Sequence, residues 1–502
     1  MRLHIRRRIS RTIAGVLALL SLAPVTATAV AQPAADTVAK LDSVARHLTR
    51  IGRANGERIW PGFRPDTIPV AFVLPAQGSV VLNWAGPLPS GYEVIPGVRN
   101  AIWRDQRALG AASMGVNLGG RSVAQVVVST LDPSDLLPTA VHEAFHVFEA
   151  ASVRPGRRFG RQENAFYVSS YPVFDEENEM MFAREGELLL RALRATNVAA
   201  KRDLARQFVA VRRARHRQLD DAYSQFDRAS ELNEGLAQYA LLRTLELMIT
   251  DQALPAEWRT LARKQLATQD ARLADLTGDV SQSFRIRYYS TGPAQARLLD
   301  ALSPSSAWKQ ELVDRNETLE DALARLSGLD ALEARLLRLA TLETDSIRVA
   351  GVARTGIARL RALRAAQVDS ALARPGVLLE LSASQLPAKD FRSCSFDPQN
   401  LLQVTATMQL HARTWQPCAG AALVAEFNVP AVHDRTVGTI RAVVGTEDEV
   451  KITVGGAPAI LADGQTLSAA KDVKLEAPRA SVQSARAHVS RSGRTLRITP
   501  LP

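Results

Sequence analysis

Two histidines and a glutamate stand close together in the segment His142-Glu143-Ala144-Phe145-His146. In a helix, residues four apart lie one turn from each other on the same face, so both imidazoles can reach a single metal ion. The carboxylate beside the first histidine can then accept a proton from a water molecule held by that ion. The spacing therefore predicts a metal site with a general base next to it.

The flanking residues argue against the alternative of two histidines on an exposed helix without a metal. Val141, Phe145, Val147 and Phe148 make this an apolar helix, which predicts that it packs into a core. Two histidines and a carboxylate are buried in an apolar core only when hydrogen bonds, ion pairs or a metal ion compensate their loss of water. A metal ion at this helix would provide such compensation.

A catalytic zinc ion needs a third protein ligand and an open position for water. The best candidate is Glu234, in the segment ELNEGLAQY at 231–239, where Glu231, Glu234 and Gln238 share one helical face. Gly235 is small, as is the alanine two residues later, which allows this helix to pack close to the histidine helix. Glu234 could instead be an exposed helix residue, and other glutamates could be the ligand: Glu176, Glu177 and Glu185.

The elements that must position these residues change in kind along the chain. After a short amphipathic helix at 36–53, prolines and glycines punctuate the apolar runs of 60–130, which predicts strands joined by turns. From 131 to 374, apolar residues recur at intervals of three and four, which predicts helices almost throughout. Strands first and helices afterwards, with the histidine helix at the junction, indicate an α+β catalytic unit at 32–374.

Individual helices are expected at 176–195, 198–226, 231–250 and 256–276, and within 319–373. We interpret the arginine-rich stretch 211–217 as an outer helix face.

The last part of the chain, 375–502, has alternating apolar runs separated by glycine, aspartate and proline, which predicts an all-β domain. A sandwich is the default expectation. Both cysteines of the chain, Cys394 and Cys418, fall here. In an exported protein they are expected to form one disulfide, which stabilises the region by about 3 kcal/mol in the loop-entropy description.

Residues 1–31 have the three parts of an export signal: arginines, an apolar run at 13–25, and small residues ending in Ala29-Val30-Ala31. We expect cleavage after Ala31 and a periplasmic or extracellular protein. The apolar run is too short for the roughly 20 residues that span a bilayer, so an uncleaved anchor is the lesser alternative. No later segment predicts a membrane span.

The formal net charge of +11 does not indicate nucleic-acid binding once the charges are located. Five arginines lie within the first eleven residues, and the remaining excess is interleaved with acidic residues along helices. No nucleic-acid partner is expected, and no pattern in the sequence sets the oligomeric state.

HEAFH followed by NEGLAQY resembles the gluzincins, the zinc metallopeptidases related to thermolysin and the aminopeptidases. The resemblance implies a zincin-like catalytic unit in which His142, His146 and Glu234 hold one zinc ion and Glu143 is the general base. Gln238, one turn after the third ligand, matches the place where thermolysin-like enzymes have an acid that orients a histidine. Here that residue is a neutral amide.

Two further positions follow from the same resemblance. In RIRYYSTG at 285–292, Tyr289 lies three residues before the glycine and matches a tyrosine of the aminopeptidase branch that donates a hydrogen bond to the oxyanion. The alternative is a tyrosine that packs at a helix start. The strand residues 126–128, directly before the histidine helix, are expected at a sheet edge that pairs with an extended peptide, or else in the sheet interior.

The sequence departs from the family in two places. The stretch between His146 and Glu234 is longer than in compact members, so 176–226 reads as an inserted helical pair. No segment like Gly-Ala-Met-Glu-Asn precedes the histidines, which favours an endopeptidase. We therefore expect an exported zinc peptidase acting on a peptide or protein substrate. The alternatives are an inactive zincin-like binding or scaffold protein of the cell envelope and a zinc amidase acting on cell-wall peptide.

Overall fold

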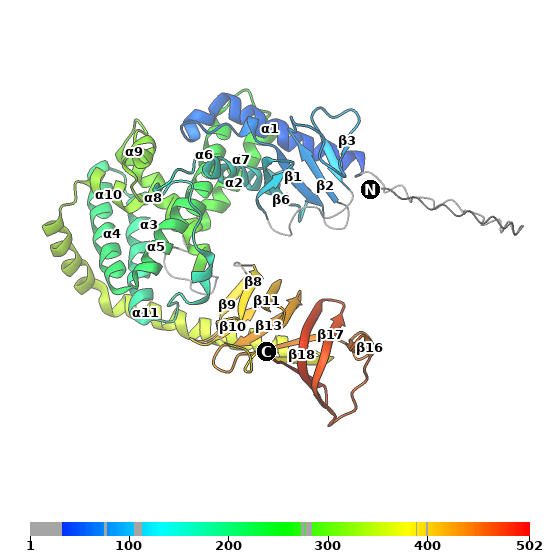
Figure 1. Cartoon of the computed structure of the whole chain (residues 1–502). Helices are drawn as coiled ribbons and strands as arrows, with labels where there is room; N and C mark the ends of the chain where they lie inside the picture. The colour runs from blue at the N-terminus through cyan, green and yellow to red at the C-terminus, as the bar shows by residue number, and fades with distance from the viewer. Residues whose placement is uncertain are drawn as a thin grey trace, which may run out of the picture.

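The computed structural model describes residues 33–74, 78–104, 113–272, 276, 284–387, 389–397 and 400–502. The expected signal peptide at 1–31 lies outside them. Along the described chain, a helix and a small sheet are followed by a helical region and then by a β-rich region, so helices and strands are both present (Figure 1). Among these residues, no helix is both long and apolar enough to cross a membrane.

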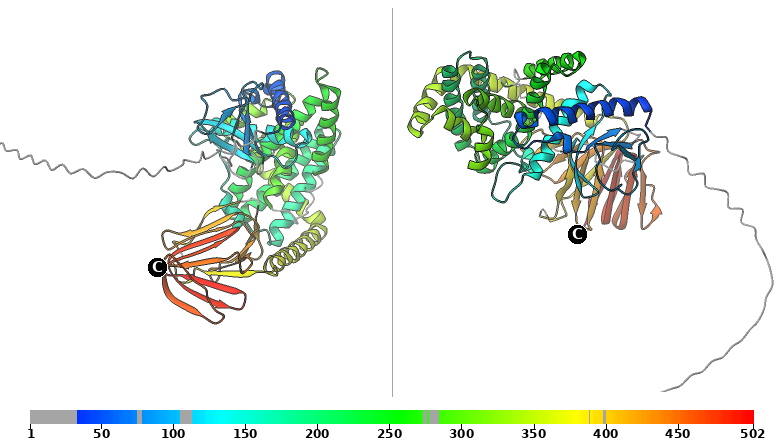
Figure 2. Two further views of the ribbon diagram at one scale, coloured as in Figure 1. Left: turned by 90° about the vertical axis from the view of Figure 1, so that its right-hand side faces the viewer. Right: turned by 90° about the horizontal axis from the view of Figure 1, so that it is seen from above.

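The first unit is a six-stranded sheet with the order β3-β4-β2-β1-β6-β5. Helix α1, Ala35–Ile59, runs along this sheet (Figure 2) and shares an apolar core with it. Strand β1 is antiparallel to β2 and parallel to β6. The strands are β1 Val70–Leu74, β2 Gly78–Leu82, β3 Glu93–Val94, β4 Ile102–Arg104, β5 Met114–Leu118 and β6 Arg121–Val127.

Val126 and Val127, at the end of β6, pair with Phe72 and Val73 of β1. On its other side β6 pairs with β5 from Arg121 to Gln125, so this pairing ends before Val126, and β5 is the outer strand of the described sheet. The sequence between β5 and β6 explains this arrangement, because Gly119 and its neighbour have positive φ angles of 55° and 79°. Such angles allow the tight turn that folds β5 back onto β6.

Helix α2, Pro133–Ala151, carries the two histidines and follows β6 almost directly. Its apolar face is buried as predicted. The ring of Phe145 packs edge-on against Trp60 and Phe63, with centroid distances of 5.7 and 5.1 Å. Aromatic packing of this kind adds to the area buried, and it fixes the rotation of α2 about its axis.

The helical region contains the predicted helices, with breaks that the apolar periodicity did not show. The expected helix at 198–226 divides because Asp220 caps a new helix, and the stretch 319–373 divides at Gly328, which has a left-handed φ of 72°. The helices are α3 Glu176–Arg194, α4 Val198–Gln218, α5 Asp221–Ser230, α6 Leu236–Thr250, α7 Ala256–Arg272, α8 Tyr288–Leu302, α9 Trp308–Arg315, α10 Leu319–Ser327 and α11 Ala331–Leu372. A π-helical turn, η3 (Glu231–Gly235), joins α5 to α6, and 3-10 turns lie at η1 Pro65–Thr67, η2 Ala165–Ser169 and η5 Phe284–Arg287.

The expectation that 211–217 form an outer helix face is wrong for two of the arginines. The side chains of Arg212 and Arg215 have no exposed surface, whereas Arg217 is exposed. The buried guanidinium groups are compensated by carboxylates of other helices, among them Glu185 at 3.1 Å from Arg212 and 2.7 Å from Arg215. Burial of the two cations is tolerated because they are paired in this way.

The β-rich region follows α11 and was predicted as an all-β domain. Its strands belong to one continuous, branched, thirteen-stranded sheet that is nearly closed into a barrel, which differs from the sandwich that we expected (Figures 1 and 2). The strands are β7 Val377–Ser382, β8 Arg392–Phe396, β9 Leu401–Gln403, β10 Met408–His411, β11 Trp415–Ala419, β12 Leu423–Phe427, β13 Ala431–Asp434, β14 Thr439–Gly445, β15 Lys451–Val454, β16 Ala457–Pro458, β17 Thr466–Ala477, β18 Ala480–Ser492 and β19 Thr495–Pro500.

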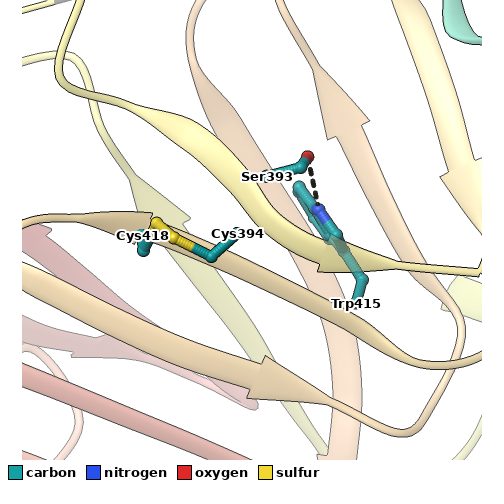
Figure 3. The surroundings of a disulfide bond; sticks show 4 residues. All are labelled: Ser393, Cys394, Trp415 and Cys418. Carbon is teal, nitrogen blue, oxygen red and sulfur yellow. Dashed lines mark hydrogen bonds between the residues drawn. A yellow bond between two sulfur atoms is a disulfide. The ribbon is translucent and has the colours of Figure 1, made fainter. Parts of the chain in front are cut away.

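The predicted disulfide between Cys394 and Cys418 is present and joins the neighbouring strands β8 and β11 (Figure 3). Its two Cα atoms are 5.9 Å apart, an ordinary separation for a disulfide. Beside it, Trp415 donates a hydrogen bond from its indole nitrogen to the hydroxyl of Ser393 at 2.8 Å. The same strand β8 reaches the helical region, since Phe396 packs on Phe166 of η2 with a centroid distance of 5.2 Å.

Candidate metal centre

The side chains of His142, His146 and Glu234 converge on one point between α2 and η3. The two Nε2 atoms are 3.0 Å apart, and Oε2 of Glu234 lies 3.2 Å from Nε2 of His142 and 3.4 Å from Nε2 of His146. These residues form a group that could hold a metal ion, as the sequence predicted. The convergence joins positions 92 residues apart in the chain.

The spacing of the three atoms fits a tetrahedral ion. Zinc binds histidine nitrogen and carboxylate oxygen at about 2.0–2.1 Å, so neighbouring ligand atoms of a tetrahedral site lie about 3.3–3.4 Å apart. The observed triangle is slightly tighter than this, which means that a shift of a few tenths of an ångström would seat an ion. Two nitrogens and one oxygen are also the donor set of known catalytic zinc sites with an open fourth position.

Glu234 is positioned by the π-helical turn and by a neighbouring cation. Its second carboxylate oxygen accepts a hydrogen bond from Arg285, which also pairs with Glu163. Glu163 in turn accepts a hydrogen bond from the side chain of Asn233. One oxygen of Glu234 is thereby fixed on a guanidinium group while the other faces the histidines. π-helical turns of this kind are frequent at functional sites.

Of the two small residues in this segment, Gly235 packs against Gly292 of α8: a Cβ atom added at Gly235 would lie only 2.6 Å from the Cα of Gly292. The two backbones therefore touch where η3 crosses α8, and neither position has room for a side chain. Helix α6, which carries the alanine two residues later, packs against the histidine helix α2 as expected.

The alternative third ligands do not join the group. Glu185 is fully buried and pairs with two arginines of α4, Arg212 and Arg215. Glu176 and Glu177 lie at the start of α3, where Glu176 accepts a hydrogen bond from Arg354 and Glu177 one from Gln218. In the part of the chain that the structure describes, Glu234 is the carboxylate that meets both histidines.

Glu143 lies next to the cluster and is buried, with 6% of its surface exposed. Burial raises the pKa of its carboxyl group, and the nearby imidazoles of His142 and His146 oppose that shift. A carboxylate with a raised pKa is a better proton acceptor than an ordinary one, which suits the predicted role of a general base.

Tyr289, at the start of α8, lies at the same site. Its ring stacks on the imidazole of His142 with a centroid distance of 5.5 Å and an interplanar angle of 7°. Burial and the charge of Glu234 raise the pKa of its hydroxyl group well above the usual value, so the group remains a proton donor. The hydroxyl group is a hydrogen-bond partner of Glu234, and the tyrosine lies in the first turn of α8, the place of the packing alternative.

The second histidine, His146, is oriented by Glu149, a residue outside the predicted site. Nδ1 of His146 lies 3.2 Å from Oε2 of Glu149, whose side chain is 2% exposed. Burial raises the pKa of Glu149 to about 7, against the attraction of the imidazole. Gln238, which matches the place of an orienting acid in thermolysin-like enzymes, donates its amide to Gln269 at 2.9 Å.

A local pattern could have revealed Glu149. It stands three residues after His146 in the same helix, so the two side chains share a face. No comparable signal existed for Glu163 and Arg285, because they reach the site from segments that meet only in the folded chain.

Behind η3, a network of buried ion pairs ties the surrounding helices together. Glu231 lies 2.6 Å from Arg212. His216 lies 3.2 Å from each of Asp227 and Glu320, which it bridges. Burial opposes ionisation of Glu320, but His216 and Arg212 outweigh it and place the pKa of this carboxyl below its ordinary value. The π-helical turn that carries Glu234 is thus held in place by buried ion pairs, in which each charged group is stabilised by the opposite charge of its partner.

Comparisons of the chain with protein-family models, with curated proteins and with solved structures found no match. What the site can do therefore follows from its own residues and their geometry.

Proposed function

We propose that the protein is an exported zinc-dependent peptidase that cleaves peptide bonds within polypeptides. The observation that carries the proposal is the convergence of His142, His146 and Glu234, with the buried carboxylate of Glu143 beside them. A metal alone would not need that carboxylate. A carboxylate with a raised pKa next to two histidines and a third ligand is the arrangement of water-activating metallohydrolases.

Each residue has a separate task in this proposal. His142, His146 and Glu234 hold the ion, and zinc bound there would acidify a water molecule and polarise the substrate carbonyl group. Glu143 accepts the proton from the attacking water and passes it to the leaving amine. Tyr289 donates a hydrogen bond to the oxygen that gains negative charge, a contribution of about 3 kcal/mol in comparable sites.

A peptide substrate is supported by the sheet next to the site. Strand β5 is an edge strand, and it lies beside β6, which leads directly into α2. An extended peptide can add to such an edge through main-chain hydrogen bonds, which give affinity without demanding a particular sequence. The disulfide between Cys394 and Cys418 supports export, because such bonds persist in oxidising compartments.

The proposal is tested with purified wild-type protein and its Glu143→Gln variant. We expect about one zinc ion per chain in both proteins, since Glu143 is not a ligand. Wild type should cleave casein at internal bonds, and Glu143→Gln should lose activity by at least about 100-fold, the effect of removing a general base. Equal activity of the two proteins would refute the mechanism, and a zinc-loaded wild type without activity on peptides would refute the function.

The ligand assignment is tested in parallel. His146→Ala and Glu234→Ala should lose zinc, whereas Glu177→Ala, a matched change of an exposed carboxylate on α3, should keep it. Zinc retained in Glu234→Ala would show that another group is the third ligand.

A further inference from the structure

A cavity of about 600 Å³ lies between α5, the segment 158–167 and the N-terminus of α10. This volume falls within the range of sites that accept small organic groups. Three arginines line the cavity, Arg158, Arg161 and Arg228, together with a single carboxylate, Asp221. The wall therefore has a positive balance of charge.

The acidic groups beside the cavity are shared among several cations. Asp321 lies 3.5 Å from Arg158 and 3.4 Å from Arg213. Glu320 accepts a hydrogen bond from Arg228 at 3.0 Å and is also held by the buried network behind η3. One carboxylate cannot fully neutralise two or more guanidinium groups, so positive potential remains in the wall.

Arg161 shows most clearly that the positive charge of this wall is not fully neutralised. Its side chain is exposed and lines the cavity, and no carboxylate lies within ion-pair distance of it among the residues that the structure describes. Asp221 is engaged by Gln225, which donates a hydrogen bond to it at 2.5 Å. The rings of Tyr167 and Phe226 add apolar surface to the same wall. A guanidinium group without a carboxylate, next to aromatic surface, suits an anionic group on an organic chain.

We propose that this cavity binds an acidic side chain, aspartate or glutamate, of the polypeptide substrate. The inference rests on the proposed peptidase function. The segment that lines the cavity is tied to the metal centre, because Glu163, two residues after Arg161, pairs with Arg285, which holds Glu234. A substrate bound through an acidic residue would therefore contact the segment that positions the third ligand.

The experiment measures binding without hydrolysis, using the full-length Glu143→Gln protein. Isothermal titration calorimetry compares N-acetyl-tetraglutamate amide with the matching tetraglutamine peptide. We expect the acidic peptide to bind at least tenfold more tightly, and we expect Arg161→Gln to weaken its binding about tenfold, the effect of losing a charge-assisted hydrogen bond. Arg263→Gln, a change of an exposed arginine on α7 away from the cavity, should leave the affinity unchanged.

Equal affinities for the two peptides, or an unchanged affinity in Arg161→Gln, would overturn the assignment. Inorganic phosphate that displaces the acidic peptide and binds as tightly would also overturn it, by reducing the cavity to a site for small anions. Because the titration requires no bond cleavage, these outcomes are separate from failure of the peptidase function, which the casein assay of the wild type detects.

Discussion

Removing the carboxylate of Glu149 tests how firmly the second histidine is held. The contact between Oε2 of Glu149 and Nδ1 of His146 is 3.2 Å long and almost fully buried. A hydrogen bond to a charged group contributes about 1.5–3 kcal/mol, and loss of such outer contacts lowers metal affinity about 10–100-fold. Glu149→Ala should therefore bind zinc about 10–100-fold more weakly than wild type.

Glu149→Gln separates charge from geometry at the same position. The amide keeps an oxygen that can accept from His146, but a neutral hydrogen bond is roughly half as strong as a charged one. We expect a loss of about 3–10-fold, smaller than in Glu149→Ala. Competition with a chromophoric chelator at fixed pH measures the affinity, and melting of the metal-free proteins reports any change in stability separately.

A matched control is Glu257→Gln, which neutralises an exposed carboxylate on α7 and should bind zinc like wild type. The reasoning is refuted if both Glu149 variants also keep wild-type affinity. An equal loss in the two variants would show that charge alone matters, contrary to the orienting contact described for His146.

Three further outcomes concern stability. Arg212→Ala leaves buried carboxylates unpaired and should lower the free energy of unfolding in urea by about 3–5 kcal/mol. Its control, Arg213→Ala, removes a partly exposed arginine and should lower that free energy by less than about 1 kcal/mol. Similar losses in the two variants would contradict the stabilising role of the buried ion pairs. The pKa of Glu320 is lower in the folded protein than in the unfolded chain, where it is about 4.3, so its ionised form stabilises the fold above that pH. The urea concentration at the midpoint of unfolding should therefore fall as the pH drops below that value. A midpoint that does not change with pH in this range would contradict the lowered pKa. Replacing Cys394 and Cys418 by serine should cost about 3 kcal/mol under oxidising conditions and nothing under reducing ones.

The part of the site that was predictable is the part fixed by local geometry. The helical period places His142 and His146 on one face wherever the helix lies, so their spacing alone indicated a shared metal. Glu234 could be chosen only as the best of several candidate glutamates, since nothing local connects it with α2. Its second oxygen, held by Arg285, could not be predicted, because that contact exists only when η3 and η5 meet.

The arginines of α4 show why the surroundings of the site could not be predicted from the sequence. A run of cations on an amphipathic helix usually faces solvent, and burial of Arg212 depends on carboxylates from three other elements. Each of those carboxylates looks like an ordinary surface residue in its own segment. In the sheet, β6 lies between β1 and β5 because the chain turns at Gly119 and folds β5 back onto β6. The pair of glycines in the sequence indicates a turn, but it does not indicate which strands the turn brings together.

The crossing of Gly235 and Gly292 has a consequence for how the site tolerates change. Gly235 directly follows Glu234, and Gly292 lies three residues after Tyr289, so these two side chains belong to segments whose backbones are in contact. A contact between two main chains does not depend on the size or rotamer of the surrounding apolar side chains, whereas a methyl group added at either glycine would force the two segments apart.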